Sequence, residues 1–235
     1  MSAKTFLLIH GAWHGGWAWQ RVADRLRAGG HEVFTPTLTG LGERAHLLQP
    51  DVDLSLHIAD VLGVITHERI TDCVLVGHSY GGCVVSGVAE KVPGIIRSIV
   101  FLDAFIPDNG DATVDLVQPA VQEIIQAALE RGDTTIPVRD AAAFKVNEKD
   151  RAWVDSLAGP QPIRTMTEKI KLTGARERIA KKTYIRASGY PNVSFEKAHA
   201  RAKADPTWRT YEVPCGHDVM IDAPDRLTEI LLEVG

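Results

Sequence analysis

Residues 73–82 read CVLVGHSYGG, and the rest of the chain is organised around them. The first four residues are apolar and include two valines, as expected of a short strand that is buried on both faces. After the closing glycine pair, apolar residues recur at helical spacing, at 84, 85, 88, 89 and 92. Between strand and helix lies Gly77-x-Ser79-x-Gly81, the pattern of a nucleophile elbow, whose sharp turn raises a serine hydroxyl above the sheet. Ser79 is therefore the predicted nucleophile.

The alternative is a serine in an ordinary strand-to-helix turn. Glycines on both sides of Ser79 allow the strand and the helix to pass closely. The N-terminus of the following helix also favours the negative charge that develops on a substrate oxygen. Because a five-residue pattern is common by chance, the catalytic interpretation depends on the strand before it and the helix after it.

The composition bounds the class of protein. The chain has 235 residues, 45% of them hydrophobic and 24% charged, which suits one soluble domain with a sizeable core. A net charge of −4 argues against nucleic acid as a partner. The three cysteines form no metal-binding spacing, so we expect free thiols in a reducing compartment, with no metal and no cofactor. No apolar run has transmembrane length, and the first residues lack the apolar core of a signal peptide, so we expect a cytoplasmic protein without membrane contact.

Strands and helices alternate along most of the chain, which predicts an α/β fold with a mainly parallel, doubly wound sheet. Ligands in such sheets bind beyond the carboxyl ends of the strands. The loop that begins at His10, Ser79 and Asp103 each follow a predicted strand. The predicted strands are Thr5–Ile9, Glu32–Thr35, Cys73–Val76, Ile95–Leu102, Thr183–Arg186 and Arg209–Val213.

The alternation stops between residues 107 and 182. About seventy-five residues are too many for a plain loop. Apolar spacing there indicates short helices and no buried strand, so we expect a helical cap inserted after the strand that ends at Asp103. The predicted division is residues 1–106 as the first part of the core, 107–182 as the cap, and 183–235 as the second part of the core.

A serine needs a base, and histidine is the side chain whose pKa suits that task near neutral pH. His217 follows the last predicted strand, late in the chain, as the order nucleophile, acid, base requires. It is the predicted base. We expect His14, in the first glycine-rich loop, to line the substrate pocket. The remaining histidines are expected to serve local hydrogen bonds, the core or the surface: His10, His31, His46, His57, His67, His78 and His199.

Four segments together resemble the α/β-hydrolases, in the branch of plant methylesterases, salicylate-binding esterases and hydroxynitrile lyases. They are HGAWHGGWAW at 10–19, GHSYGG at 77–82, LDAFIP at 102–107 and GHDVM at 216–220. The resemblance implies the α/β-hydrolase fold, and it implies that the backbone N–H groups of Ala12 and Tyr80 form an oxyanion hole.

The chain departs from the hydroxynitrile lyases at two positions. Those enzymes carry a threonine after the histidine of the first strand and a lysine after the catalytic histidine. This chain has Gly11 and Asp218 there. The lysine would hold a developing cyanide anion, and an aspartate would repel it. The lyase reaction is therefore disfavoured.

The chain also departs from most of the family in the position of the triad acid. Most members of the family place it after the strand equivalent to Thr183–Arg186, but residues 187–192 contain no carboxylate. Asp103 ends the strand next to the elbow, 24 residues after Ser79, and keeps the order Ser79, Asp103, His217. We therefore predict Asp103 as the acid, in preference to Asp205, Asp218 and Asp222. The alternative is that Asp103 only caps a loop while the serine and histidine work with a water or with Asn192.

These observations predict a serine hydrolase that cleaves an ester or lactone of a small, uncharged, largely apolar molecule through an acyl-enzyme on Ser79. Trp13, Tyr80 and Phe105 are the aromatic residues expected at the pocket, although simple core packing explains each of them equally well. The alternatives are a small-molecule receptor with slow turnover, and a hydroxynitrile lyase or another carbon–carbon-cleaving relative. A homodimer is compatible with the sequence.

Overall fold

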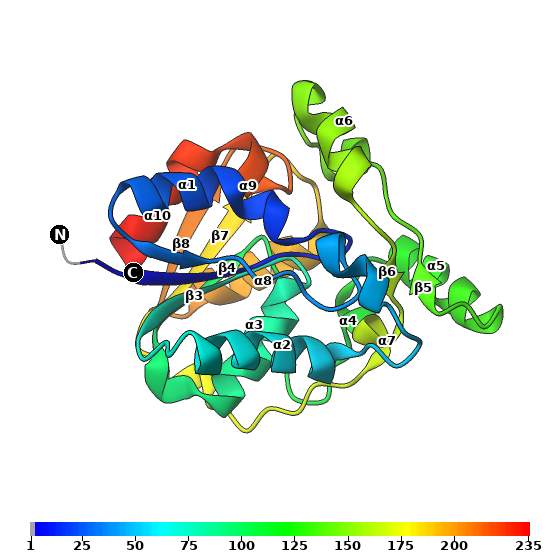
Figure 1. The fold of residues 1–235 in the computed structure, drawn as a ribbon, viewed down its shortest axis with the longest axis horizontal. Coiled ribbons are helices and arrows are strands. Elements are labelled where there is room, and N and C mark those ends of the chain that lie inside the picture. Colours follow the sequence, from blue (N-terminus) through cyan, green and yellow to red (C-terminus); the bar gives the residue numbers. More distant parts are fainter. Residues whose placement is uncertain (1–2) are drawn as a thin grey trace.

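The computed structural model describes residues 3–235 and contains a central sheet of six parallel strands (Figure 1). The strand order is β2-β1-β3-β4-β7-β8. The predicted parallel sheet is confirmed, and each predicted strand is present with ends shifted by up to two residues. The strands are β1 (Thr5–Ile9), β2 (Glu32–Phe34), β3 (Cys73–His78), β4 (Ile96–Leu102), β7 (Lys182–Ala187) and β8 (Trp208–Val213).

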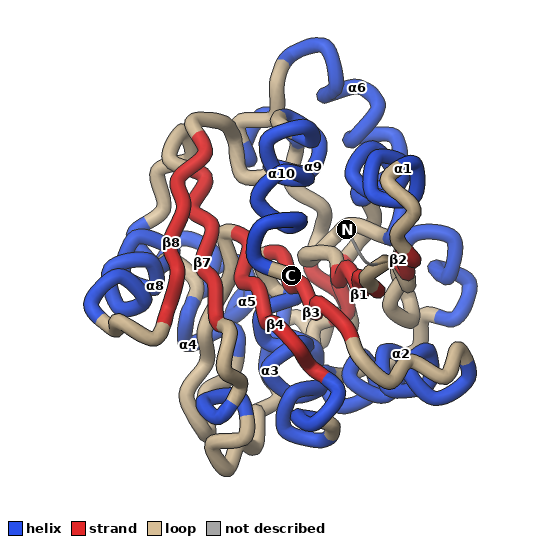
Figure 2. Tube along the Cα trace, turned by 90° about the vertical axis from the view of Figure 1, so that its left-hand side faces the viewer, coloured by secondary structure: helices blue, strands red, loops and turns tan. Residues whose placement is uncertain are grey.

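Helices cover both faces of this sheet. Helices α1 (Gln20–Ala28) and α10 (Pro224–Val234) pack together on one face, and α2 (Leu54–His67) and α3 (Gly81–Lys91) pack together on the other (Figures 1 and 2). Helix α8 (Val193–Ala204) packs against β7 and β8. The short elements of the core are α9 (Val219–Asp222), η1 (Gly16–Trp19), η2 (Gly42–Leu47) and η3 (Pro93–Ile95).

The middle of the sheet is apolar on both faces because helices cover both. Every residue of β3 is buried, as are all nine residues from Gly81 to Ala89 of α3, which follows it. Side chains of this kind lose most of their water-exposed area on folding, which stabilises the protein by roughly 1.5–3 kcal/mol for each large one. The elbow between β3 and α3 is therefore anchored between two buried segments.

The register of the strands brings the candidate residues to one edge of the sheet. His78 of β3 pairs with Leu102 of β4, so the next residues, Ser79 and Asp103, leave neighbouring strands at the same level. Leu102 in turn pairs with Ile185 of β7, so the level continues to Arg186. This edge is formed by the carboxyl ends of the strands, where parallel sheets bind their ligands.

The inserted segment, which we define as residues 107–181, connects β4 to β7 over this edge. Its short helices were predicted, but the prediction that it contains no buried strand is wrong in detail. Two residues on either side of α6 pair as an antiparallel β5–β6 ladder, too short to show a periodic pattern in the sequence. The elements are α4 (Thr113–Leu116), α5 (Pro119–Glu130), β5 (Thr135–Ile136), η4 (Ala141–Phe144), α6 (Glu148–Leu157), β6 (Gln161–Pro162), α7 (Arg164–Thr167) and η5 (Arg176–Arg178). The division into core and cap domains stays a prediction.

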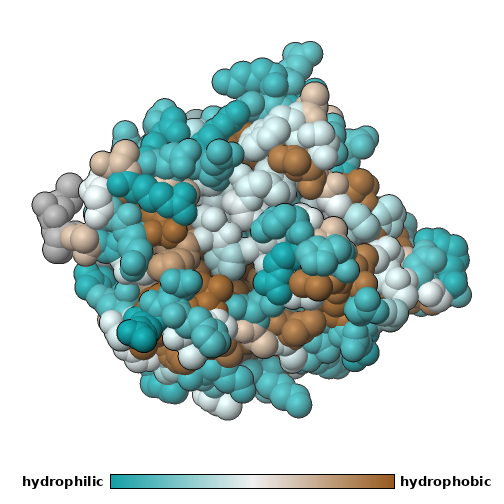
Figure 3. Space-filling view, viewed as in Figure 1, coloured by the Kyte–Doolittle hydropathy of each residue, from teal (hydrophilic) through white to brown (hydrophobic). Residues whose placement is uncertain are grey.

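Hydrophilic residues cover much of the face in Figure 3, with apolar groups in its lower half and at its right. Single exposed apolar side chains such as Leu47 and Leu56 are ordinary for a folded protein. Within residues 3–235, no helix combines the length and the apolar character needed to cross a membrane. The cytoplasmic location and the homodimer stay predictions.

Candidate active site

Ser79 stands on a strained turn at the end of β3. Its φ of 54° lies in the left-handed region, which a residue with a side chain rarely adopts and which costs on the order of 1–3 kcal/mol. The turn is held by the Ser79 carbonyl, which accepts hydrogen bonds from the N–H groups of Gly82 and Phe105 at 3.0 and 3.2 Å. A Cβ at Gly77 would lie 2.5 Å from the Gly81 carbonyl oxygen, so the glycines of the motif are needed for this close passage.

Asp103 and His217 are in direct contact. Asp103 directly follows β4, has a φ of 41° and is fully buried. Its Oδ2 lies 2.7 Å from Nδ1 of His217, which follows β8 in a loop. The two residues are 114 positions apart in the chain, and the fold brings them together. Asp205, the acid that the sequence analysis disfavoured, is exposed and bonded to Thr207.

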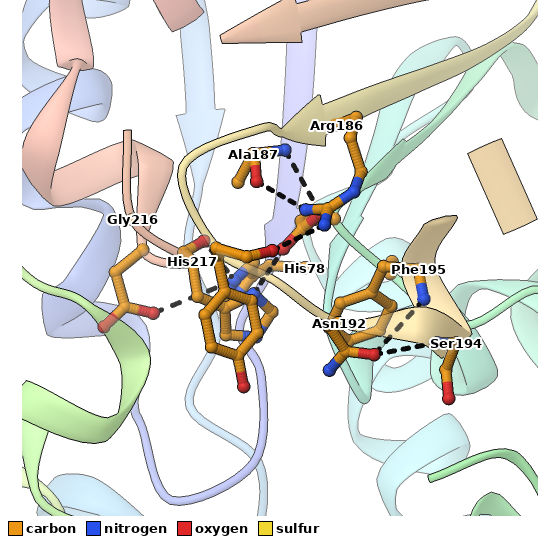
Figure 4. Close-up of polar contacts among 12 residues, drawn as sticks. His78, Arg186, Ala187, Asn192, Ser194, Phe195, Gly216 and His217 are labelled. Carbon is orange, nitrogen blue, oxygen red and sulfur yellow. Dashed lines mark hydrogen bonds and ion pairs between the residues drawn. The ribbon is translucent and has the colours of Figure 1, made fainter. Parts of the chain in front are cut away.

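Arg186 holds the other oxygen of the same carboxylate. Its Nη1 donates to Oδ1 of Asp103 at 2.6 Å, and the backbone N–H of Ala187 donates to that oxygen at 3.1 Å. The guanidinium also donates to the carbonyls of Ala187 and Tyr190, both at 2.5 Å, so one arginine joins the carboxylate to the loop after β7 (Figure 4). Sequence reasoning missed this residue. The available signal was an arginine near the end of a predicted core strand, because a buried charge needs a partner.

Aromatic rings enclose the imidazole of His217, which is 3% exposed. The Phe195 ring stacks on it at a centroid distance of 5.1 Å and an interplanar angle of 12°. Tyr190 lies 4.8 Å away and Phe144 5.7 Å away, both with tilted rings. This packing and the bond to Asp103 fix the ring plane. Figure 4 shows Phe195 and His217 entering this cluster from different segments.

Ser79 and His217 line the same cavity, but no hydrogen bond of normal geometry joins them within residues 3–235. Hydrogen bonds of this kind are often long or poorly aligned in the absence of substrate and tighten when it binds. The arrangement places a serine hydroxyl and an oriented imidazole on one cavity, with a carboxylate behind the imidazole.

The backbone N–H groups of Ala12 and Tyr80 donate to no other group in the described part of the chain, and both residues line the cavity. The loop that carries Ala12 is firmly held. The N–H of Trp13, whose φ is 65°, donates to Oε1 of the fully buried Gln161 at 3.0 Å. Nδ1 of His14 donates to the Ala12 carbonyl at 2.7 Å. Two unpaired donors on rigid backbone match the requirement for stabilising a developing oxyanion.

The cavity itself has a volume of about 40 Å³. It adjoins a wider cleft of about 810 Å³ between the inserted segment and α8, and both are lined by Phe105, Val117 and Gln118. The three aromatic residues expected at the pocket, Trp13, Tyr80 and Phe105, all line this cavity. The sequence analysis missed the remaining lining residues, most of which belong to the inserted segment and carry no motif: Val117, Gln118, Val121, Arg139, Phe144, Met166, Tyr190 and Asn192.

His14 corrects a prediction, because it is absent from the lining of this cavity. It is 2% exposed, and its Nε2 lies 3.1 Å from Oδ2 of the fully buried Asp218. Burial opposes protonation of His14, but the charge of Asp218 and its hydrogen bond outweigh that effect and raise the pKa of the histidine. Burial on its own would raise the pKa of Asp218, but the charge of His14 and its hydrogen bond outweigh burial. The pKa of Asp218 therefore lies below its usual range. The two residues form a buried ion pair beside the cavity.

The other buried histidines have structural partners. His10 accepts from the N–H of Leu38 at 3.0 Å, and burial lowers its pKa to about 3. His57 lies between the Tyr80 hydroxyl and the Thr39 carbonyl, at 3.0 and 2.9 Å, and burial lowers its pKa to about 4. Both are therefore neutral near pH 7. Across residues 3–235, no three His, Cys, Asp or Glu side chains gather in a way that would hold a metal ion.

Comparison with known proteins defines the class. The model of the alpha/beta hydrolase family matches residues 6–230. The chain is 40% identical to the carbendazim hydrolyzing esterase of Nocardioides sp. (strain SG-4G), with 98% of this chain and 99% of that one covered. It is 36% identical to salicylic acid-binding protein 2 of Nicotiana tabacum over 109 residues, which are 45% of this chain and 41% of that protein. Among solved structures, an extracellular alpha/beta-hydrolase from a Paenibacillus species superposes with a TM-score of 0.86 at 26% identity, covering 99% of both chains.

The chain belongs to the alpha/beta hydrolase family. The extent and the level of its similarity to an esterase make it an enzyme of the esterase class. The resemblance inferred from the four sequence segments and the predicted fold class are both confirmed.

Proposed function

We propose that this enzyme hydrolyses a carboxylic ester or lactone of a small molecule through an acyl-enzyme on Ser79. The observation that carries the proposal is the 2.7 Å contact between His217 Nδ1 and Asp103 Oδ2 beside a cavity that Ser79 also lines. A serine, an oriented imidazole and a buried carboxylate are the parts that acyl transfer requires.

In the proposed first step, the Ser79 oxygen attacks the substrate carbonyl while Nε2 of His217 takes its proton. The N–H groups of Ala12 and Tyr80 donate to the oxyanion of the tetrahedral intermediate. When the bond from the carbonyl carbon to the alkoxy oxygen breaks, His217 returns the proton to the leaving alcohol. Water then attacks the acyl-enzyme with His217 again acting as the base, which releases the acid and restores Ser79. Asp103 holds the imidazole in the tautomer that carries its proton on Nδ1.

The size of the cavity supports a small acyl group. A volume of about 40 Å³ holds only a few waters, whereas sites for drug-sized ligands are on the order of 300–1,000 Å³. The adjoining cleft of about 810 Å³ has the size that a larger leaving group needs. We therefore propose that the acyl group occupies the cavity and that the alcohol portion extends along Phe105 and Val117 into the cleft.

The environment of Asp218 supports hydrolysis over the lyase reaction. Its carboxylate is fully buried against His14 and does not line the cavity, so no side chain at this position is available to hold cyanide. The slowly turning-over receptor remains the competing function, and the similarity to salicylic acid-binding protein 2 favours it over other binding proteins.

The test is a substrate panel measured with the purified protein. It contains p-nitrophenyl esters from acetate to octanoate, methyl esters, γ-lactones and carbendazim. We expect steady-state turnover on at least the short esters, and we expect none from the folded Ser79→Ala variant. A protein that binds these ligands tightly but shows no turnover would be a receptor, and release of cyanide from mandelonitrile would reveal a lyase.

A further inference from the structure

One cationic side chain lines the otherwise largely apolar cavity. Arg139 lies in the loop between β5 and η4, and its guanidinium stands over the Phe144 ring, 5.2 Å from the ring centroid. In residues 3–235 it makes neither an ion pair nor a hydrogen bond. By contrast, Arg131 in the same inserted segment pairs with Asp133, and the buried Arg176 donates to the Pro107 carbonyl. Arg139 is therefore a partly buried cation whose donors are unused.

The contact with Phe144 places the guanidinium carbon over the ring and is not a hydrogen bond, so the N–H donors bond to no acceptor within residues 3–235. A guanidinium carries five N–H donors in its plane, and an aromatic ring below that plane satisfies none of them. The contact with the ring also restricts the side chain, so less conformational entropy is lost when the guanidinium binds an acceptor. No carboxylate lines the cavity to compete for these donors, as far as the described residues go.

A second donor on the same cavity belongs to Asn192. Its Oδ1 accepts the N–H groups of Ser194 and Phe195, at 3.0 and 3.3 Å, where it caps α8. These two bonds assign the oxygen of the amide, so the remaining atom is the Nδ2 donor. That donor has no acceptor within the described residues, and Figure 4 shows it on the side of the amide away from the capping contacts. Arg139 and Asn192 thus give the cavity donors that bond to no acceptor among the described residues.

We infer that Arg139, supported by Asn192, recognises a second hydrogen-bond acceptor on the substrate, a carbonyl or carboxylate oxygen separate from the reacting ester. This inference rests on the proposed function of the same cavity and narrows it. The preferred substrates are keto esters, diesters or half-esters rather than plain alkyl esters. It also revises the expectation of a largely apolar, uncharged substrate, which was made without knowledge of the cavity lining.

The experiment compares ligands of nearly equal shape. Methyl 4-methylpentanoate offers no second acceptor, methyl 4-oxopentanoate offers a ketone, and monomethyl succinate offers a carboxylate. The same three types with one more methylene test a second spacing. Binding is measured by calorimetry on the Ser79→Ala protein, and kcat/KM is measured on the protein with Ser79 intact. Each is repeated with Arg139→Gln and Arg139→Lys, and with Arg131→Gln as the matched control on the same segment.

We expect the ketone or the carboxylate to bind on the order of tenfold more tightly than the apolar isostere, with the same preference in kcat/KM. Arg139→Gln should reduce the preference to about twofold or less, Arg139→Lys should retain part of it for the carboxylate, and Arg131→Gln should leave it unchanged. Comparison of the ketone ligand with the carboxylate ligand shows whether the site prefers a neutral acceptor or an anion.

Failure of this inference is distinguishable from failure of the proposed function. Hydrolysis without any preference for an acceptor at either spacing, or a preference that survives Arg139→Gln, overturns the role of Arg139 while the esterase stands. A preference in binding that depends on Arg139 but comes with no turnover refutes hydrolysis and retains the acceptor site. If binding is too weak for calorimetry, the ratios of kcat/KM decide.

Discussion

Replacement of Asp103 by asparagine is the perturbation whose outcome the structure defines most fully. Oδ1 of Asp103 accepts hydrogen bonds from Arg186 and from the Ala187 N–H, and both are donors. The amide of Asp103→Asn must therefore place its oxygen there and turn its NH₂ toward His217. Nδ1 of His217 then has to accept a hydrogen bond, so its proton moves to Nε2. An imidazole with a proton on Nε2 cannot take one from Ser79.

The expected loss is on the order of 10³–10⁴ in kcat with little change in KM, equivalent to about 4–5.5 kcal/mol of transition-state stabilisation. The substitution also removes the buried counter-charge of Arg186 and leaves only the exposed Glu196, 3.7 Å from Nη2, which costs about 3–5 kcal/mol of stability. For a chain of this size that lowers Tm by roughly 6–20 °C. The activity loss and the stability loss must therefore be separated.

A double variant separates them. Asp103→Asn/Arg186→Met removes the charge that has lost its buried partner, so it should regain part of the lost Tm without regaining activity. Asp205→Asn is the matched control, and both its kcat and its Tm should equal those of the parent because Asp205 is exposed. The assays are steady-state hydrolysis of a short p-nitrophenyl ester and thermal unfolding followed by circular dichroism. A folded Asp103→Asn protein that keeps more than a tenth of kcat would refute the reasoning.

Three further predictions concern the surroundings of the site. Because the pKa of His14 is raised, its pair with Asp218 contributes its full stability below the ordinary histidine pKa and loses that stability as pH rises through the raised pKa. The difference in unfolding free energy between the parent and His14→Gln should therefore shrink in urea titrations from pH 6 to 9. A constant difference would contradict the ion pair. Burial raises the pKa of Cys215 from 9.0 to about 12. The native thiol should therefore react with Ellman's reagent at pH 8 on the order of 10³-fold more slowly than the same thiol in the unfolded chain. Fast labelling would contradict the burial of Cys215. Met166→Ala should lower the unfolding free energy by about 2–4 kcal/mol. Because Met166 lines the cavity, the substitution should also raise the ratio of kcat/KM for hexanoate over acetate esters. An unchanged ratio would show that the acyl group lies elsewhere.

The sequence predicted the parts of the fold that depend on local pattern. β3 and α3 are recognisable because an apolar run changes to helical spacing across two glycines. Asp103 was predicted as the acid by elimination, since the register that brings it level with Ser79 depends on strand pairing that no local pattern encodes. Parallel sheets of this type nevertheless place the carboxyl ends of their strands at one edge. A carboxylate at such an end could therefore be preferred over the other candidates from the sequence.

The residues that shape the cavity were beyond sequence reasoning for a physical reason. Arg139, Phe144 and Met166 lie in or beside elements of four residues or fewer, where neither helical nor strand periodicity can develop. Their positions are set by how the inserted segment folds over the sheet. His14 was misplaced because its loop approaches the site, while its ring turns away to meet Asp218, a partner more than two hundred residues later in the chain.

The central claim is that hydrolysis passes through an acyl-enzyme on Ser79, and mass spectrometry tests it most directly. The enzyme is mixed with p-nitrophenyl acetate, quenched in acid within the burst phase and digested for peptide mapping. The account predicts one acetyl group on the peptide that contains Ser79, in an amount equal to the nitrophenol burst, and neither burst nor acetyl group in Ser79→Ala. An acetyl group on another residue, or steady turnover by Ser79→Ala at the parent's rate, would contradict it.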